Sequence, residues 1–144
     1  MTIAAILKHK GHDVAHVAPT ASVAEVVQLL AARRIGAVVV LDAADQLLGI
    51  VSERDIVGSL AEHGKRTLEM TAAQLMTRDL HIATMHTTVP QATEMMTTGR
   101  FRHLPVMDGG KLLGIVSIGD VVKARLSQQE QEVDSLKAYV AGDA

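Results

Sequence analysis

Residues 48–57 read LGIVSERDIV and residues 113–122 read LGIVSIGDVV, so one ten-residue stretch occurs twice in the chain. The match continues upstream, where residues 34–42 align with residues 100–108. The offset between the copies changes there from 65 to 66 positions, which places one extra residue in the turn that follows Asp42. Solenoids usually need three or more repeats. Two copies instead predict a pseudo-symmetric module with two equivalent clefts.

Both copies predict the same order of elements. Each has a short extended stretch, a helix that begins with a capping box, two apolar strands joined by a polar turn, and a second helix that begins at a serine. These features occupy residues 13–17, 22–36, 37–41, 47–51 and 52–64 in the first copy, and residues 80–84, 88–99, 104–107, 112–116 and 117 onward in the second. Gly36 and Gly99 are expected to end the first helices. The predicted fold class is α+β, with two β-α-β-β-α repeats packed as one pseudo-twofold module.

The last predicted helix carries apolar residues beyond the end of the repeat. These residues recur at alternating spacings of four and three positions, which is a heptad pattern interrupted by one glutamine. They are Val122, Leu126, Gln129, Val133, Leu136 and Val140. We therefore expect an extended C-terminal helix. Two interpretations of its apolar stripe remain open: the helix packs on its own module, or it pairs with a second chain.

Composition excludes several classes of protein. The 144 residues are 48% apolar and 21% charged, which excludes intrinsic disorder, and the net charge of −2 provides no field that would attract nucleic acid. Phe101 and Tyr139 are the only aromatic residues, so bases cannot be bound by aromatic stacking. No segment is apolar enough for a signal peptide or a membrane span. With no cysteine in the chain, we expect a cytoplasmic protein that contacts neither membrane nor nucleic acid.

Both copies share a Gly-x-x-Ser-x-x-Asp motif at a strand-to-helix junction. Its members are Gly49, Ser52 and Asp55 in the first copy, and Gly114, Ser117 and Asp120 in the second. A helix N-terminus attracts anions through its unpaired N–H groups, and a glycine permits close approach of backbone or ligand. An ionised aspartate accepts hydrogen bonds from vicinal hydroxyls such as those of ribose. The alternative is structural, because Ser-x-x-Asp at a helix start is itself close to a capping box.

Together, the paired hairpins, the two GIVSxxD junctions and the RHLPV stretch at residues 102–106 resemble the cystathionine-β-synthase (CBS) domain family, in the tandem arrangement called a Bateman module. The resemblance covers roughly residues 13–126, and the motifs are similar to those of stand-alone bacterial and plant-organelle members. On this basis we divide the chain into repeat 1 (8–64), a linker (65–78), repeat 2 (79–126) and a C-terminal helical extension (127–144).

The resemblance implies a regulatory module with no catalysis of its own and no catalytic cofactor. Its ligand would be an adenosyl compound such as AMP, ADP, ATP, NAD or S-adenosylmethionine, bound in clefts between the repeats. In the family, Ser or Thr and Asp of the motif contact ribose and phosphate, which here designates Ser52 with Asp55 and Ser117 with Asp120. A homodimer and a separate regulated protein are the expected partners.

The resemblance also implies that basic residues near the cleft bind phosphate, which is consistent with the repulsion between phosphate and an aspartate. The candidates are Arg54, Arg102 and His103. The copies differ at these positions, since Arg54 corresponds to Gly119 and residues 102–103 correspond to residues 36–37. The two clefts are therefore expected to differ in affinity or ligand. Alternatively, Arg54 is only a solvated helix charge and His103 packs at the hairpin edge.

Catalysis and metal binding find little support in the sequence. Ser52 and Ser117 lack a Gly-x-Ser-x-Gly context, and no Walker-type or dinucleotide-binding glycine loop is present. His9, His12 and His16 are closely spaced, but no cysteine or acidic cluster accompanies them, so no metal site is predicted. The alternative to an adenosyl-binding module is a ligand-free dimerisation or scaffold module whose motif residues are only helix caps.

Overall fold

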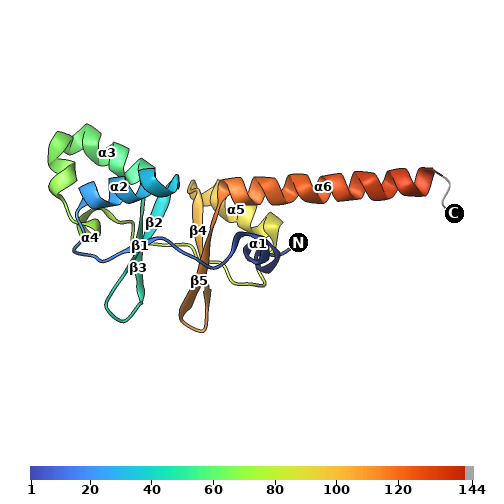
Figure 1. Ribbon diagram of the computed structural model, residues 1–144, viewed down its shortest axis with the longest axis horizontal. Helices are drawn as coiled ribbons and strands as arrows, with labels where there is room; N and C mark the ends of the chain where they lie inside the picture. Colours follow the sequence, from blue (N-terminus) through green and yellow to red (C-terminus); the bar gives the residue numbers. More distant parts are fainter. Residues whose placement is uncertain (142–144) are drawn as a thin grey trace. The chain divides into compact units, whose positions relative to one another are not determined.

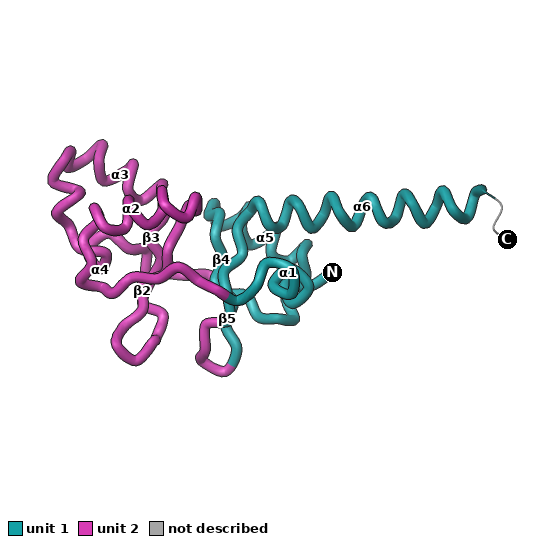
Figure 2. Tube along the Cα trace, in the orientation of Figure 1, with its two compact units in different colours: residues 1–12, 82–108, 113–144 teal, residues 13–81, 109–112 magenta. Residues whose placement is uncertain are grey.

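A computed structural model describes residues 1–141, so the last three residues of the predicted C-terminal extension lie outside the described residues. The chain forms two compact units (Figure 2). Unit 1 is assembled from residues 1–12, 82–108 and 113 onward, whereas unit 2 comprises residues 13–81 and 109–112. The N-terminal residues therefore belong to the unit that contains the second motif.

Both units combine helices with short strands, which confirms the predicted α+β fold class (Figure 1). Unit 1 contains α1 (Ile3–Lys10), α5 (Val89–Gly99), β4 (His103–Asp108), all but the first two residues of β5 (Lys111–Ser117), and α6 (Ile118–Val140). Unit 2 contains β1 (His16–Val17), α2 (Val23–Arg33), β2 (Ala37–Leu41), β3 (Leu47–Ser52), α3 (Glu53–His63), the 3-10 helix η1 (Gly64–Glu69) and α4 (Ala72–Leu75). The single helix α6 confirms the predicted extended C-terminal helix.

The two predicted hairpins form, but the extended stretches that precede each repeat differ. In unit 2, β1 pairs in parallel with β2, which pairs antiparallel with β3. In unit 1, β4 pairs with β5, and the stretch predicted at residues 80–84 is reduced to one parallel bridge between Ala83 and Val106.

A proline accounts for the missing strand. In unit 2 the amide of Val39 donates to the carbonyl of Ala15 at 3.2 Å. The aligned position in the second copy is Pro105, which has no N–H to donate. Its carbonyl still accepts from the amide of Ala83 at 2.9 Å, and this supports the one remaining bridge.

The helix ends differ in part from the predictions. Thr88 forms the predicted capping box with Gln91, whereas Ser22 caps α2 through the Glu25 amide without the reciprocal bond from its own amide to the Glu25 side chain. The prediction for Gly99 is confirmed, because α5 ends at that residue, whereas the prediction for Gly36 is wrong, because α2 already ends at Arg33. The left-handed residues after α2 and α5 are Arg34 and Arg100, with φ of 54° and 55°. Arginine at positive φ gives no sequence signal, because glycine is the residue that normally occupies this conformation.

Residues 65–78, predicted only as a linker, contain most of η1 and all of α4 and pack within unit 2. Thr67 is fully buried, and its hydroxyl lies 2.8 Å from that of Ser59 on α3. Ala72 at the start of α4 is also fully buried, and the helix begins with a capping box between Thr71 and Gln74. That Thr-x-x-Gln pattern was a sequence signal for a helix in this segment.

Each unit has its own cluster of buried apolar residues. In unit 2 the cluster joins the valines of α2, β2 and β3 to Ala72 of α4. In unit 1 it joins residues of α5, β4 and β5 to α1, whose Ile3 and Leu7 are fully buried. In both units, therefore, a helix from outside the repeated β-β-α segment packs against the strands that carry the motif.

Candidate functional site

Both Gly-x-x-Ser-x-x-Asp motifs lie at strand-to-helix junctions, β3 to α3 in unit 2 and β5 to α6 in unit 1. Ser52 and Ser117 are the N-cap residues, and each forms a complete capping box with the aspartate three positions later. The Ser52 amide donates to Asp55 Oδ2 at 2.9 Å, and the Ser117 amide donates to Asp120 Oδ2 at 2.8 Å. The capping interpretation of the motif therefore holds in both copies, and any ligand must bind to a junction that is already ordered.

The unit 2 junction contains a threonine from the segment after the repeat. Thr77 Oγ1 donates to Asp55 Oδ1 at 3.2 Å, while Ser52 Oγ donates to Oδ2 at 3.0 Å. Both carboxylate oxygens of Asp55 thus already accept hydrogen bonds from the chain. A ribose hydroxyl would have to share or replace the Thr77 contact.

The unit 1 junction contains a lysine in place of that threonine. Lys10 at the end of α1 donates from Nζ to Asp120 Oδ2 at 2.6 Å and to the Ile115 carbonyl at 2.8 Å. Their side chains are 34% and 24% exposed, so the ion pair is only partly screened by water. Sequence analysis missed Lys10 because it lies 110 residues from Asp120 in the chain.

The environment of Asp120 lowers its pKa below the ordinary 3.8 of an aspartate. Burial raises this pKa, but the hydrogen bonds from Lys10 and from the Ser117 amide, together with the Lys10 charge, outweigh it. Asp120 is therefore ionised at neutral pH. A negative oxygen acceptor is available there, with a cation directly beside it.

The motif glycines are approached closely by the chain itself. A Cβ at Gly49 would lie 2.7 Å from the Thr77 carbonyl oxygen and 2.8 Å from Met76 Sδ. A Cβ at Gly114 would lie 2.8 Å from Leu7 Cδ2. The segments that supply Thr77 and Lys10 to the aspartates therefore also require a glycine in the strand beneath them.

The three basic candidates divide between the units. Arg54 is exposed in the first turn of α3, one residue before Asp55. Arg102 is exposed and His103 half-buried at the start of β4 in unit 1, and the Arg102 carbonyl accepts from the Ile118 amide at 2.8 Å. This bond brings Arg102 and His103 to the junction of Ser117 and Asp120, as the equivalent bond from Glu53 to Gly36 does in unit 2. Arg54 therefore lies in unit 2, whereas Arg102 and His103 lie in unit 1, and the difference in phosphate binding between the two sites stays a prediction.

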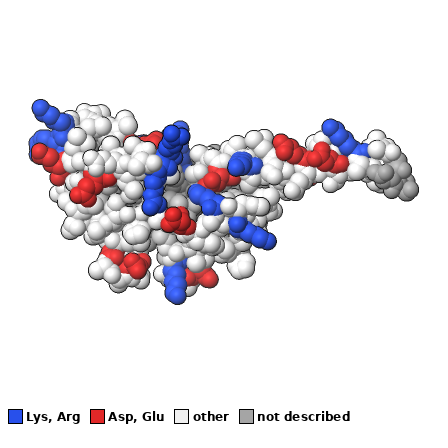
Figure 3. Space-filling view, viewed as in Figure 1, with Lys and Arg blue, Asp and Glu red and all other residues white. Residues whose placement is uncertain are grey.

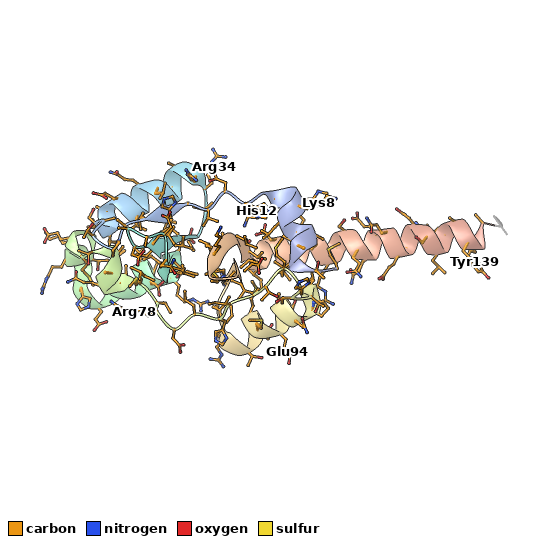
Figure 4. The ribbon with its side chains drawn as sticks, turned by 90° about the horizontal axis from the view of Figure 1, so that it is seen from below. Lys8, His12, Arg34, Arg78, Glu94 and Tyr139 are labelled. Carbon is orange, nitrogen blue, oxygen red and sulfur yellow. The ribbon has the colours of Figure 1, made fainter. Side chains whose placement is uncertain are left out.

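We expect replacement of Lys10 by methionine to raise the pKa of Asp120, because burial then acts without the opposing ion pair. In the wild type, the lowered pKa adds stability that is complete above about pH 3.8 and is lost as the pH falls through the folded-state value. Lys10→Met should lose part of the stability that the lowered pKa of Asp120 adds in the wild type. NMR titration of the Asp120 carboxyl carbon measures the shift. Lys8→Met is the control, because Lys8 is exposed on the same helix (Figure 4); equal titration curves in the two variants would contradict the assignment.

Within residues 1–141, no helix combines the length and the apolar character needed to cross a membrane. The same residues hold no group of three or more His, Asp or Glu side chains placed to share a metal ion.

The family model and the similar proteins found by comparison all indicate the same family. A model described as the CBS domain matches residues 7–62 and 72–127. The crystal structure of a CBS-domain containing protein from Agrobacterium tumefaciens is 45% identical, with a TM-score of 0.84 and coverage of 86% of this chain and 92% of that chain. CBSX2, solved in complex with AMP, is 29% identical, with a TM-score of 0.70 and coverage of 83% and 92%.

A curated relative, the mitochondrial CBS domain-containing protein CBSX3 of Arabidopsis thaliana, is 33% identical over 125 residues. The match covers 84% of this chain and 61% of that protein, so the chain spans less than two thirds of this relative's length.

Proposed function

Because the chain belongs to the CBS domain family, we propose that it is a non-catalytic regulatory module that binds an adenosyl ligand at its two Ser-x-x-Asp junctions. The observation that carries the proposal is the duplicated junction, in which an ionisable carboxylate lies in the first turn of a helix in both units. The AMP complex of CBSX2 supports the ligand class. AMP, ADP, ATP, NAD and S-adenosylmethionine are the candidates.

The chemistry of each junction suits a nucleotide in two parts. Asp55 or Asp120 would accept hydrogen bonds from ribose hydroxyls, as the acidic residue of dinucleotide-binding folds does. The phosphates, which a carboxylate repels, would bind to the helix N-terminus and to Arg54 in unit 2, or to Arg102 and His103 in unit 1.

The two sites should differ in their preference for phosphate. The unit 1 junction gathers Lys10, Arg102 and His103, whereas Arg54 is the basic candidate of the unit 2 junction. More positive charge favours more phosphate groups. We therefore expect ATP and ADP to prefer unit 1, and AMP to discriminate less between the units.

Isothermal titration calorimetry with the five candidate ligands tests the proposal. Asp55→Asn and Asp120→Asn should each weaken the ligand by about 1–3 kcal/mol at the altered site, because a charged acceptor is lost. Asparagine keeps one side-chain oxygen that can accept the serine amide, so the cap is largely preserved. Asp134→Asn, an exposed position on α6, is the control. If none of the five ligands binds the wild type, the adenosyl proposal fails.

The second candidate function is a ligand-free dimerisation or scaffold module. It is favoured by the complete capping boxes and by the hydrogen bonds that Asp55 and Asp120 already accept. Native mass spectrometry of the purified protein distinguishes the two functions. A retained adenosyl mass supports the regulatory module; no retained mass, together with no thermal shift on addition of nucleotide, supports the scaffold.

The remaining parts of the proposal concern partners and compartment. A homodimer and a separate regulated protein would convert ligand binding into an output. We propose a cytoplasmic location, since a chain without cysteine suits a reducing compartment. One relative is named as mitochondrial, so fractionation of the source cells is the direct test.

A further inference from the structure

Helix α6 packs within unit 1 only over its first part. Val121 is buried and Ala124 packs against the unit 1 core, but every residue from 129 to 141 is exposed. In Figures 1 and 2 this part of α6 continues beyond the other elements of unit 1. Most of the stability of a helix in a protein comes from the packing of its apolar face, and residues 129–141 gain none from unit 1.

The exposed part carries the apolar heptad stripe. Val122 and Leu126 are 51% and 55% exposed, and Leu136 is 63% exposed. The interpretation that the stripe packs on its own module therefore does not hold in this structure. A contiguous apolar stripe on a charged helix marks a surface for another protein.

The charges beside the stripe indicate which partner fits. With Leu126, Val133 and Val140 at heptad positions a, the flanking g positions include Arg125 and Glu132, and the e positions include Glu130 and Lys137. In a parallel coiled coil each g residue faces the e residue five positions later on the other helix. Two in-register copies of α6 would thus pair Arg125 with Glu130, and Glu132 with Lys137. Figure 3 shows basic groups, then acidic groups and then a basic group along α6.

The antiparallel alternative is disfavoured by the same residues. In a fully overlapped antiparallel pair, e positions face e positions, so Lys123 would face Lys137 and Glu130 would face its own copy. Like charges in such positions are repulsive. In the parallel pair, Gln129 at a d position faces its own copy, where the two amides can hydrogen-bond; a buried polar residue of this kind fixes register.

We propose that α6 is the docking surface for α6 of a second copy of this chain, in a parallel, in-register coiled coil from Val122 to Val140. The contact is independent of any nucleotide, so it would persist if the proposed ligand binding failed. All the polar and charged residues that would form this contact lie on α6 of the two chains.

Cysteine cross-linking tests the geometry directly, because the chain contains no cysteine of its own. Leu136→Cys, at a d position, should form a disulfide-linked dimer in high yield under mild oxidation, since equivalent d residues lie within disulfide reach in a parallel pair. Asp134→Cys, exposed two residues away at an outer position, should give at least fivefold less. Equal yields from the two variants, or no covalent dimer from Leu136→Cys, would overturn the proposal.

The charge pairing is tested in the Leu136→Cys background. Glu130→Lys should lower the cross-linking yield severalfold by placing a lysine opposite Arg125, and adding Arg125→Glu should restore it. A cross-linking yield that stays the same in both variants would contradict the parallel pairing. A mixture of Leu126→Cys and Leu136→Cys chains that cross-links to each other better than Leu136→Cys does to itself would show an antiparallel pair, and the proposal would be wrong.

Discussion

Replacing Leu7 by alanine is expected to lower the free energy of unfolding by about 2–5 kcal/mol, the usual range for a buried leucine. Leu7 is fully buried although it lies near the N-terminus, and it packs directly over Gly114 in β5. The residue should therefore contribute as much as a central core residue of unit 1. Urea denaturation followed by circular dichroism measures the change, with Lys8→Ala as the exposed control on the same helix.

A double-mutant cycle sharpens this prediction. In the wild-type background Gly114→Ala would place its Cβ 2.8 Å from Leu7 Cδ2, so it should be destabilising. In the Leu7→Ala background the clashing methyl is gone and the new Cβ fills part of the cavity. The second substitution should then be much less costly, or stabilising. Strictly additive free energies would show that the two residues do not contact each other.

Gly49→Ala is expected to lower the free energy of unfolding by about 1–3 kcal/mol or more through overpacking. This loss should exceed that of Gly114→Ala. The atom that a Cβ at Gly49 meets at 2.7 Å is the backbone oxygen of Thr77, which cannot rotate away as a leucine side chain can. Moving Thr77 would also strain its two backbone hydrogen bonds with Ile50, of 3.0 and 2.8 Å. Thermal unfolding compares the variants.

Gly58→Ala is the matched control for Gly49→Ala. Gly58 lies in α3, and a Cβ there would meet nothing within 4 Å. Alanine is favoured over glycine in a helix by about 0.5–1 kcal/mol, so this variant should be neutral or slightly stabilised. Similar losses at Gly49 and Gly58 would contradict the close-approach argument. Because Thr77 also binds Asp55, we expect Gly49→Ala to weaken any nucleotide bound in unit 2 as well.

The fold was predictable to the extent that its signals are local. Hairpins, serine caps and the long last helix follow from patterns within a few residues, and the repeat provided each signal twice. Arg34 and Arg100 in the left-handed conformation were not predictable, because their local sequence carries no glycine at that position. The loss of the strand before the second repeat could have been inferred from Pro105, but only if the pairing register of β1 and β2 in the first copy had been known.

The candidate site was predictable only in the part that repeats. Ser52, Asp55, Ser117 and Asp120 lie as expected at the two helix starts, whereas Lys10 and Thr77 were missed. These two residues reach the aspartates from segments 110 and 22 positions away in the chain. They also differ in chemistry, an ammonium in one copy and a hydroxyl in the other. A comparison of the two copies alone therefore cannot reveal them, and their assignment depends on tertiary structure.

The division of unit 1 into three segments has a consequence for biosynthesis. Residues 1–12 are synthesised before the strands that bury Ile3 and Leu7, which follow about a hundred residues later in the chain. Most of unit 2 can fold before β4 and β5 are synthesised. During this time the apolar residues of α1 remain exposed. Contacts between such distant segments slow folding. A bulky N-terminal fusion should therefore delay maturation of the second repeat rather than the first, and a chaperone that captures nascent chains would find α1 available throughout that interval.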